Sequence, residues 1–254
     1  MGYLPEFYSS HPLKILGAMY TSFSGKLLAS IGKLDSLNVL LIGGCNFSGH
    51  IPPSLGNLTQ LTSLELSYNS FTGQIPSSLS NLISLNYMDF SHCQLSEPIP
   101  SSFGNLTQLT TLDLSYNTFT GEIPLSLSNL IFLKSLVFSS CYLSGSIPFS
   151  FGNLTQLSYL FLGGNFIRME IPLSLANLIQ LRSLSLESNQ LTGQVPSWLV
   201  NLTQLTELHL SCNKLQGPIP ISIFELKKLE FLNLHSNNLS GIVTLDMILM
   251  LKNI

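Results

Sequence analysis

The strongest constraint on how this chain folds is an internal repeat, whose first three full frames begin at Gly25, Gly49 and Gly73. The segment IPPSLGNLTQLTSLELSYNSFTG, residues 51–73, returns with small changes at 75–97, and nine frames of equal length follow one another from Gly25 to Gly241. A single frame is too short to bury an apolar face on its own. The frames are therefore expected to stack as successive coils of one elongated core.

Each frame keeps apolar residues at the same seven positions. With the glycine counted as position one, the frame from Gly49 has them at positions 3, 7, 10, 13, 16, 18 and 23, which are Ile51, Leu55, Leu58, Leu61, Leu64, Leu66 and Phe71. All nine frames keep this set apolar, so the core itself explains why 45% of the chain is hydrophobic and only 9% is charged. No apolar run approaches the ~18 residues of a membrane-spanning helix.

The spacing within a frame predicts the shape of each coil. Leu61, Leu64, Leu66 and Asn69 follow the leucine-rich-repeat spacing L-x-x-L-x-L-x-x-N. The alternating part x-L-x-L-x predicts a short strand, and such strands should pair in parallel at about 4.8 Å between coils. The Ile-Pro pairs that follow favour extended backbone. The predicted fold class is an α/β repeat solenoid with a curved parallel sheet on its concave face and 3₁₀ or helical turns on its convex side.

One frame position, position 21, carries either Asn or Cys. Its asparagines are expected to stack and to bond backbone groups inside the turn, and they are Asn69, Asn117, Asn165, Asn189, Asn213 and Asn237. Cys45, Cys93 and Cys141 occupy the same position in alternate frames. Two coils separate them by roughly 10 Å, beyond the ~7 Å that a disulfide allows, so they are predicted to be free buried thiols. Cys212 falls one position earlier and should lie near the surface.

The full pattern, L-x-x-L-x-x-L-x-L-x-x-N-x-F/L-x-G-x-I-P, resembles the plant-type extracellular leucine-rich repeat over about Leu13 to Asn253. The wording LxLSYNxFTGxIPxSLxNL looks like the ectodomains of plant receptor-like proteins, the class that includes the tomato Cf and Verticillium-resistance proteins. The resemblance implies recognition of a peptide or protein ligand at the extracellular face of the plasma membrane, in defence or developmental signalling. It also implies a membrane co-receptor kinase as partner.

Members of that class also have a signal peptide, a cysteine-bearing cap and a transmembrane helix, and none of these is recognisable here. We therefore expect an internal ectodomain fragment or the product of a truncated gene. The expected organisation is a single array over 1–254, with a degenerate first coil 1–24, nine full coils 25–240 and a partial coil 241–254. Two alternatives stay open: a soluble inhibitor of a cell-wall-degrading enzyme, as in the similar plant polygalacturonase inhibitors, or a non-signalling decoy or pseudogene product.

Other classes of function fit the residues poorly. A net charge of −3, with 10 thinly spread Lys and Arg, argues against nucleic acid. No C-x₂-C or H-x₃-H spacing indicates a metal, and nothing indicates a cofactor or a lipid partner. Asp89, His92 and Ser115 allow a catalytic triad to be drawn, but the chain has no nucleophile elbow or phosphate loop. We expect a protein that is not an enzyme.

The candidate ligand site lies on the concave face, at frame positions 17 and 20, which vary along the array. Position 17 has three acids on adjacent strands followed by two apolar residues, and position 20 adds aromatic neighbours. An exposed row of acids bordered by rings would attract Lys or Arg from a basic peptide or protein surface. The predicted ligand-binding residues are Glu65, Tyr68, Asp89, His92, Asp113, Tyr116, Val137 and Phe161.

Position nine is Asn in seven successive frames, but only alternate copies continue as N-L-T; the others read N-L-I. The Asn is therefore interpreted as a framework residue to which Thr adds a glycan acceptor on every second coil. The regular acceptors are Asn57, Asn105, Asn153 and Asn201, and two further sequons lie at Asn46 and Asn238. Glycans on these sites are expected if the chain is secreted.

Overall fold

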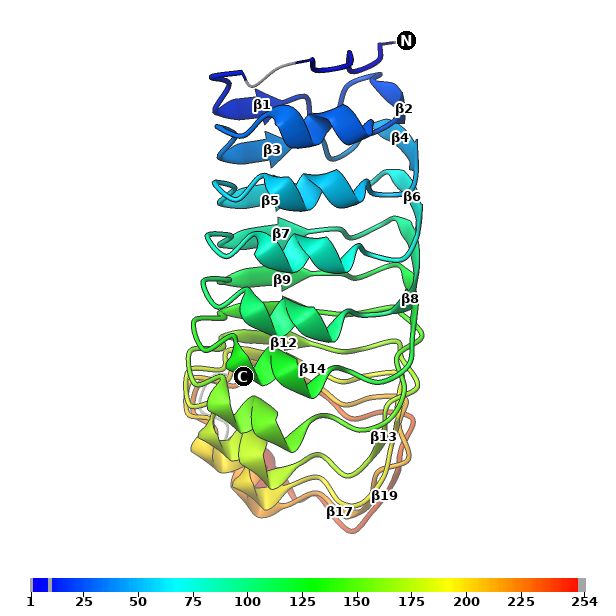
Figure 1. The fold of residues 1–254 in the computed structure, drawn as a ribbon. Coiled ribbons are helices and arrows are strands. Elements are labelled where there is room, and N and C mark those ends of the chain that lie inside the picture. The colour runs from blue at the N-terminus through cyan, green and yellow to red at the C-terminus, as the bar shows by residue number, and fades with distance from the viewer. Residues whose placement is uncertain (1, 9–10, 251–254) are drawn as a thin grey trace.

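The computed structural model describes residues 2–8 and 11–250, and each frame forms one coil. The coils stack in sequence order into a curved solenoid (Figure 1). Strands at frame positions 15–17 pair in parallel and in register, which confirms the predicted sheet. The described residues form ten of these strands: β1 (Ile15–Gly17), β3 (Val39–Leu41), β5 (Ser63–Glu65), β7 (Tyr87–Asp89), β9 (Thr111–Asp113), β11 (Ser135–Val137), β12 (Tyr159–Phe161), β14 (Ser183–Ser185), β16 (Glu207–His209) and β18 (Phe231–Asn233).

Each of these strands is three residues long, shorter than the predicted x-L-x-L-x segment. Bonds between coils nevertheless continue past the strand end: Leu66 N–H donates to Asp89 O at 2.9 Å, and Tyr68 N–H donates to Ser91 O at 3.0 Å. The regular strand stops because position 20 turns into the left-handed region, with φ +50° at Tyr68.

A second set of short parallel strands, which the spacing did not predict, runs along another side of the coils, where Figure 1 labels β2, β4, β6 and β8. One sheet contains β2 (Ser24–Lys26), β4 (Asn46–Gly49), β6 (Ser70–Gly73), β8 (Gln94–Pro98) and β10 (Thr118–Thr120). Two further pairs are β13 (Arg168–Met169) with β15 (Gln190–Leu191), and β17 (Gln216–Pro218) with β19 (Asn238–Ser240).

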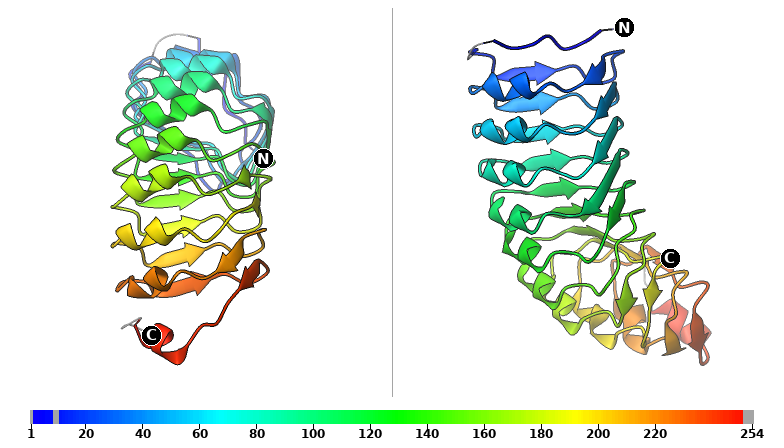
Figure 2. Two further views of the ribbon diagram at one scale, coloured as in Figure 1. Left: turned by 90° about the horizontal axis from the view of Figure 1, so that it is seen from below. Right: turned by 45° about the vertical axis from the view of Figure 1, so that its right-hand side comes forward.

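The convex side has one short 3₁₀ helix in each full coil, as predicted, and Figure 2 shows these helices along the outer curve. From the second full coil onward, a proline precedes each helix in the extended backbone expected of it, for example Pro100 with φ −62° and ψ 126°. The described helices are η1 (Ala29–Lys33), η2 (Pro53–Asn57), η3 (Ser77–Asn81), η4 (Ser101–Asn105), η5 (Leu125–Asn129), η6 (Phe149–Asn153), η7 (Leu173–Asn177), η8 (Ser197–Asn201) and η9 (Ile221–Glu225).

The seven predicted core positions are buried in the interior of the array. Leu112 and Leu114 are 0% exposed, as are their equivalents in most coils. Each such side chain contributes roughly 1.5–3 kcal/mol through burial. The last full coil is less covered, since Leu232, Leu234 and Leu239 are only partly buried. The short helix α1 (Leu245–Leu249) follows it, and residues 251–254 of the predicted partial coil lie outside the described residues.

The position-21 ladder is confirmed, and its amides bond across coils. Asn117 Nδ2 donates to the carbonyl oxygens of Phe90 at 2.8 Å and Leu114 at 3.0 Å, and Asn117 Oδ1 accepts the backbone N–H of Leu95 at 2.9 Å. Where Cys replaces Asn, the thiol keeps the contact with the preceding coil, as Cys141 Sγ does with Leu114 O at 3.4 Å.

The cysteines are free thiols within the described residues, as predicted. Cys45 and Cys141 are buried, Cys93 is partly buried, and Cys212 is exposed. Burial raises the pKa of the Cys93 thiol to about 11 and that of Cys141 to about 12, so both remain protonated donors at neutral pH. No described helix has the length and apolar character needed to span a membrane.

Candidate functional site

The strand register places Glu65, Asp89 and Asp113 side by side on β5, β7 and β9. We call these three residues the acidic row. They differ in accessibility: Glu65 is only 5% exposed, whereas Asp89 and Asp113 are half-buried. The sequence predicted an evenly solvated row. The structure instead gives one buried carboxylate and two that solvent reaches.

Hydrogen bonds hold each carboxylate of the acidic row in place. Each accepts the backbone N–H of the serine two residues later, at 3.1 Å for Glu65 and 2.8 Å for Asp89 and Asp113. The phenol oxygen of Tyr87 lies 3.0 Å from Glu65 Oε2 and 3.3 Å from Asp89 Oδ2. Sequence reasoning missed Tyr87, although its place two residues before Asp89 on the same strand face was the available signal.

Burial is the main cause that raises the pKa of Glu65, and the hydrogen bond from Ser67 opposes it. Burial likewise raises the pKa of Asp113, and the hydrogen bonds from Ser115 oppose that shift. No Lys or Arg in the described residues forms an ion pair with the acidic row. Within the described residues its charge is therefore compensated mainly by hydrogen-bond donors, and His92 adds a smaller electrostatic contribution at Asp113.

Tyr68, His92 and Tyr116 form a stack beside the acidic row. Both neighbouring pairs have ring centroids 4.1 Å apart and planes inclined by 14°. All three residues have positive φ, between +50° and +54°. The predicted site treated these rings as free to hold a cation. The structure shows them covering one another, so both faces of His92 are occupied.

Beyond Asp113, the row of position-17 side chains becomes apolar. Val137 pairs with Asp113 on one side and with Phe161 on the other, and both are partly exposed. Tyr159 lies edge-on to Phe161, with centroids 6.2 Å apart. A ligand that contacts Asp113 could therefore place an apolar group on the next two strands.

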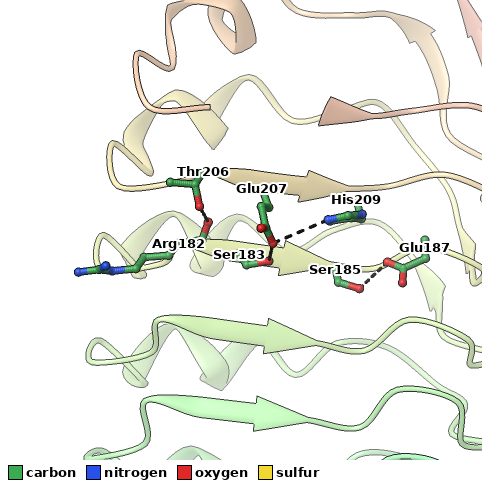
Figure 3. A network of polar contacts seen from close by, with 7 residues as sticks. All are labelled: Arg182, Ser183, Ser185, Glu187, Thr206, Glu207 and His209. Atoms are coloured by element: carbon green, nitrogen blue, oxygen red, sulfur yellow. Dashed lines mark hydrogen bonds and ion pairs between the residues drawn. The ribbon is translucent and has the colours of Figure 1, made fainter. Parts of the chain in front are cut away.

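A second polar cluster, which the sequence did not single out, lies further along the same sheet on β14 and β16 (Figure 3). Ser183 Oγ donates to Glu207 Oε2 at 2.8 Å, and His209 Nε2 lies 4.0 Å from the same oxygen. Ser185 bonds Glu187, while the Arg182 side chain points away from these carboxylates in Figure 3. The carboxylates of this cluster thus accept hydrogen bonds from serines of the same sheet.

The residues of the triad sketch do not meet in a catalytic arrangement. The Ser115 hydroxyl donates to Asp113 at 2.6 Å, and the His92 ring lies between two tyrosines. His92 and Ser115 are joined through the backbone, where His92 N–H donates to Ser115 O at 3.0 Å. No cluster of three or more His, Cys, Asp or Glu suited to a metal occurs in the part of the chain described.

The six predicted glycan acceptors, Asn46, Asn57, Asn105, Asn153, Asn201 and Asn238, are all exposed. Exposure does not separate them from Asn81, Asn129 and Asn177, which are also exposed. The framework role expected for position nine stays a prediction. Among the described residues these seven asparagines end the 3₁₀ helices, and their side chains face solvent without a hydrogen bond.

Comparison with known families supports the repeat assignment directly. The pattern described as "Leucine Rich Repeat" matches residues 36–58, 60–82, 84–106, 108–130 and 132–154. A related pattern, "Leucine rich repeat", matches residues 179–239. A comparison with curated protein sequences gives no match.

Several solved structures share the fold. A TDR receptor superposes with a TM-score of 0.90 at 40% identity, over 93% of this chain and 41% of its own. The Arabidopsis receptor kinase HAESA, in complex with the peptide hormone IDA and the co-receptor SERK1, has a TM-score of 0.74 at 30% identity, over 91% of this chain and 47% of its own. A plant ice-binding protein has a TM-score of 0.76 at 28% identity, over 87% of this chain and 71% of its own. The chain thus spans less than half the length of the two receptors.

Proposed function

Because the chain belongs to the leucine-rich-repeat family, we propose that its concave sheet recognises a basic peptide or a basic protein surface. The observation that carries the proposal is the acidic row: three carboxylates on adjacent strands, with no Lys or Arg paired to them in the described chain. A cation supplied by a ligand would reduce the repulsion between these carboxylates and would itself be attracted to them. An elongated, shallow face of this kind suits an extended ligand.

Accessibility assigns different roles within the row. Asp89 and Asp113 are half-buried and can contact a ligand, whereas Glu65 is 5% exposed and bonded to Ser67 and Tyr87. Glu65 then acts by adding negative potential beneath the site. Val137 and Phe161 would receive an apolar group that follows the basic one.

The biological setting is part of the same proposal. Similarity to the TDR receptor and to HAESA supports an extracellular receptor segment, at the outer face of the plasma membrane. The HAESA structure contains a peptide hormone and a co-receptor, which supports a peptide ligand and a co-receptor kinase as partners here. The finer assignment, to the receptor-like proteins of the tomato Cf and Verticillium-resistance class in defence or development, stays a prediction. The matched ice-binding protein shows that the fold alone does not decide the role.

A direct test uses synthetic peptides that carry Lys, Gln or Glu at the same positions of an otherwise fixed sequence. Only the Lys series should bind, and binding should weaken as salt rises. Asp89→Asn combined with Asp113→Asn should weaken binding about 5- to 30-fold, since exposed ion pairs contribute up to ~1 kcal/mol each.

The matched control removes the same charge elsewhere. Glu122→Gln with Glu170→Gln changes two exposed acids outside the ten-stranded sheet. These substitutions should leave binding of the Lys series within about twofold of the parent, because screened charges at a distance contribute little. If both double variants lose the same affinity for the Lys peptides, the effect comes from net charge and not from the acidic row. If the Asp double variant loses no affinity, the proposed site is refuted.

A further inference from the structure

At its Tyr116 end, the stack of Tyr68, His92 and Tyr116 leaves a ring face uncovered. His92 covers one face of Tyr116 at 4.1 Å, and within the described residues no ring covers the other. The residues at position 20 of the next three coils are too small to do so: they are Ser140, Gly164 and Ser188. The ring stack therefore ends at Tyr116, and the space next to the outer face of Tyr116 is not filled by another ring of the described chain.

A pocket of about 420 Å³ lies at that open position. Its volume falls within the range of about 300–1,000 Å³ that is usual for small-ligand sites. Tyr142 and Phe166 contribute a second aromatic wall, with centroids 5.9 Å apart, and each is about half exposed. We call this the stacking pocket. The residues that line it also include Tyr116, Ser140, Gly164 and Ser188, together with the position-21 side chains Cys93, Asn117, Cys141 and Asn165 and the neighbouring Thr118.

We propose that the stacking pocket binds an aromatic side chain of the ligand, as a subsite beside the acidic row. The inference rests on the proposed function, because it names a second feature of the same ligand. A ring placed above Ser140 would lie on the free face of Tyr116, continuing the 4.1 Å spacing already seen twice in the stack.

Polar groups in the stacking pocket indicate which aromatic side chain of the ligand it would bind. The hydroxyls of Ser140 and Ser188 are exposed and make no hydrogen bond within the described chain. They can bond the N–H of an indole or the O–H of a phenol, which a phenyl ring lacks. The ligand chemistry is thus a Trp or Tyr side chain close to a basic residue.

The chain itself supplies the decisive variant. Ser140 has φ +54°, and Tyr20, Tyr68 and Tyr116 adopt φ of +50° to +54° at the same frame position. Ser140→Tyr should therefore fold and fill the stacking pocket with the protein's own ring. Ser236, also at φ +54°, lies four coils further on, so Ser236→Tyr is the matched control.

The probe is N-acetyl-tryptophanamide, with N-acetyl-leucinamide for comparison, titrated into the full chain and followed by NMR of the tyrosine rings. The indole probe should shift the Tyr116 signals in the parent and in Ser236→Tyr, and it should no longer shift them in Ser140→Tyr, where the new ring covers Tyr116. Tyr116→Ser, a residue the chain already uses at this position, should weaken binding about 2- to 12-fold, the range of an aromatic pair.

Unchanged shifts of the Tyr116 signals in Ser140→Tyr would overturn the proposal, as would equally strong binding of the leucine probe. The outcome separates from that of the acidic row, because the free probe has no cation. If the Asp variants lose peptide binding but the parent does not bind the indole probe, only the stacking-pocket proposal is refuted. If the parent binds the indole probe but the Asp variants bind the Lys peptides as tightly as the parent does, only the acidic-row proposal is refuted.

Discussion

The phenol oxygen of Tyr87 lies 3.0 Å from Oε2 of Glu65 and 3.3 Å from Oδ2 of Asp89, so one hydroxyl bridges the carboxylates of two neighbouring strands. Like charges at this spacing repel, and a shared donor lowers that cost. Burial and the two carboxylates raise the pKa of Tyr87, which keeps the bridging proton in place at every physiological pH.

Removing the bridge should destabilise the array. Tyr87→Phe should lower the free energy of unfolding by about 1–2 kcal/mol, since the hydroxyl bonds charged groups that are partly buried. Tyr159→Phe is the control, because Tyr159 has the same frame position but its hydroxyl makes no hydrogen bond within the described residues. Urea unfolding at pH 7 measures both. Equal stability in the two variants would show that the bridge contributes nothing.

The acidic row should also make stability depend on pH. The pKa values of Glu65 and Asp113 are raised by burial, so the folded chain retains these protons to a higher pH than the unfolded chain. In the window just above ordinary carboxyl values of about 4, the free energy of unfolding should therefore fall as pH rises. Glu65→Gln should make that fall shallower, whereas Glu122→Gln should not. Denaturant titrations from about pH 4 to pH 7 test this, and parallel curves for all three proteins would contradict it.

Glycan occupancy should follow the alternating threonine. Expressed through a secretory pathway, the chain should carry sugar at Asn57, Asn105, Asn153 and Asn201, and none at Asn81, Asn129 or Asn177. All seven side chains are exposed, so access is the same and only the sequon differs. Peptide mapping after deglycosylation measures occupancy, and unmodified Asn at all four sequons would end the argument. Ile131→Thr, which completes a sequon at Asn129, should add a glycan at that site.

The position-21 ladder should tolerate Cys far better than Ala. Asn117→Ala leaves the N–H of Leu95 and the carbonyl of Phe90 without their buried partner, and should cost about 2–4 kcal/mol. Asn117→Cys keeps a donor to the preceding coil, as Cys141 does, and should cost less. Calorimetric unfolding of both variants gives the comparison. If the two variants unfold at the same temperature, the contact made by the thiol does not contribute to stability.

Much of the fold could be predicted because the repeat is nearly one-dimensional. Leu61, Leu64 and Leu66 have equivalents in every full frame, so a single coil decides the core, the strand position and the place of the turn in all the others. The second set of strands escaped prediction. Segments such as Thr118–Thr120 have a single apolar residue between two polar ones, a pattern too short to predict a strand, and their pairing depends on how closely the coils approach.

The sequence by itself determined which residues lie side by side on neighbouring coils, since residues at the same frame position must line up along the array. Glu65, Asp89 and Asp113 were placed in a row on that ground. Only the tertiary structure decided which of them solvent reaches, that Tyr87 bridges two of them, and that His92 lies covered between two tyrosines. Those outcomes depend on how side chains from neighbouring coils compete for the same space and the same donors, which a frame position does not specify.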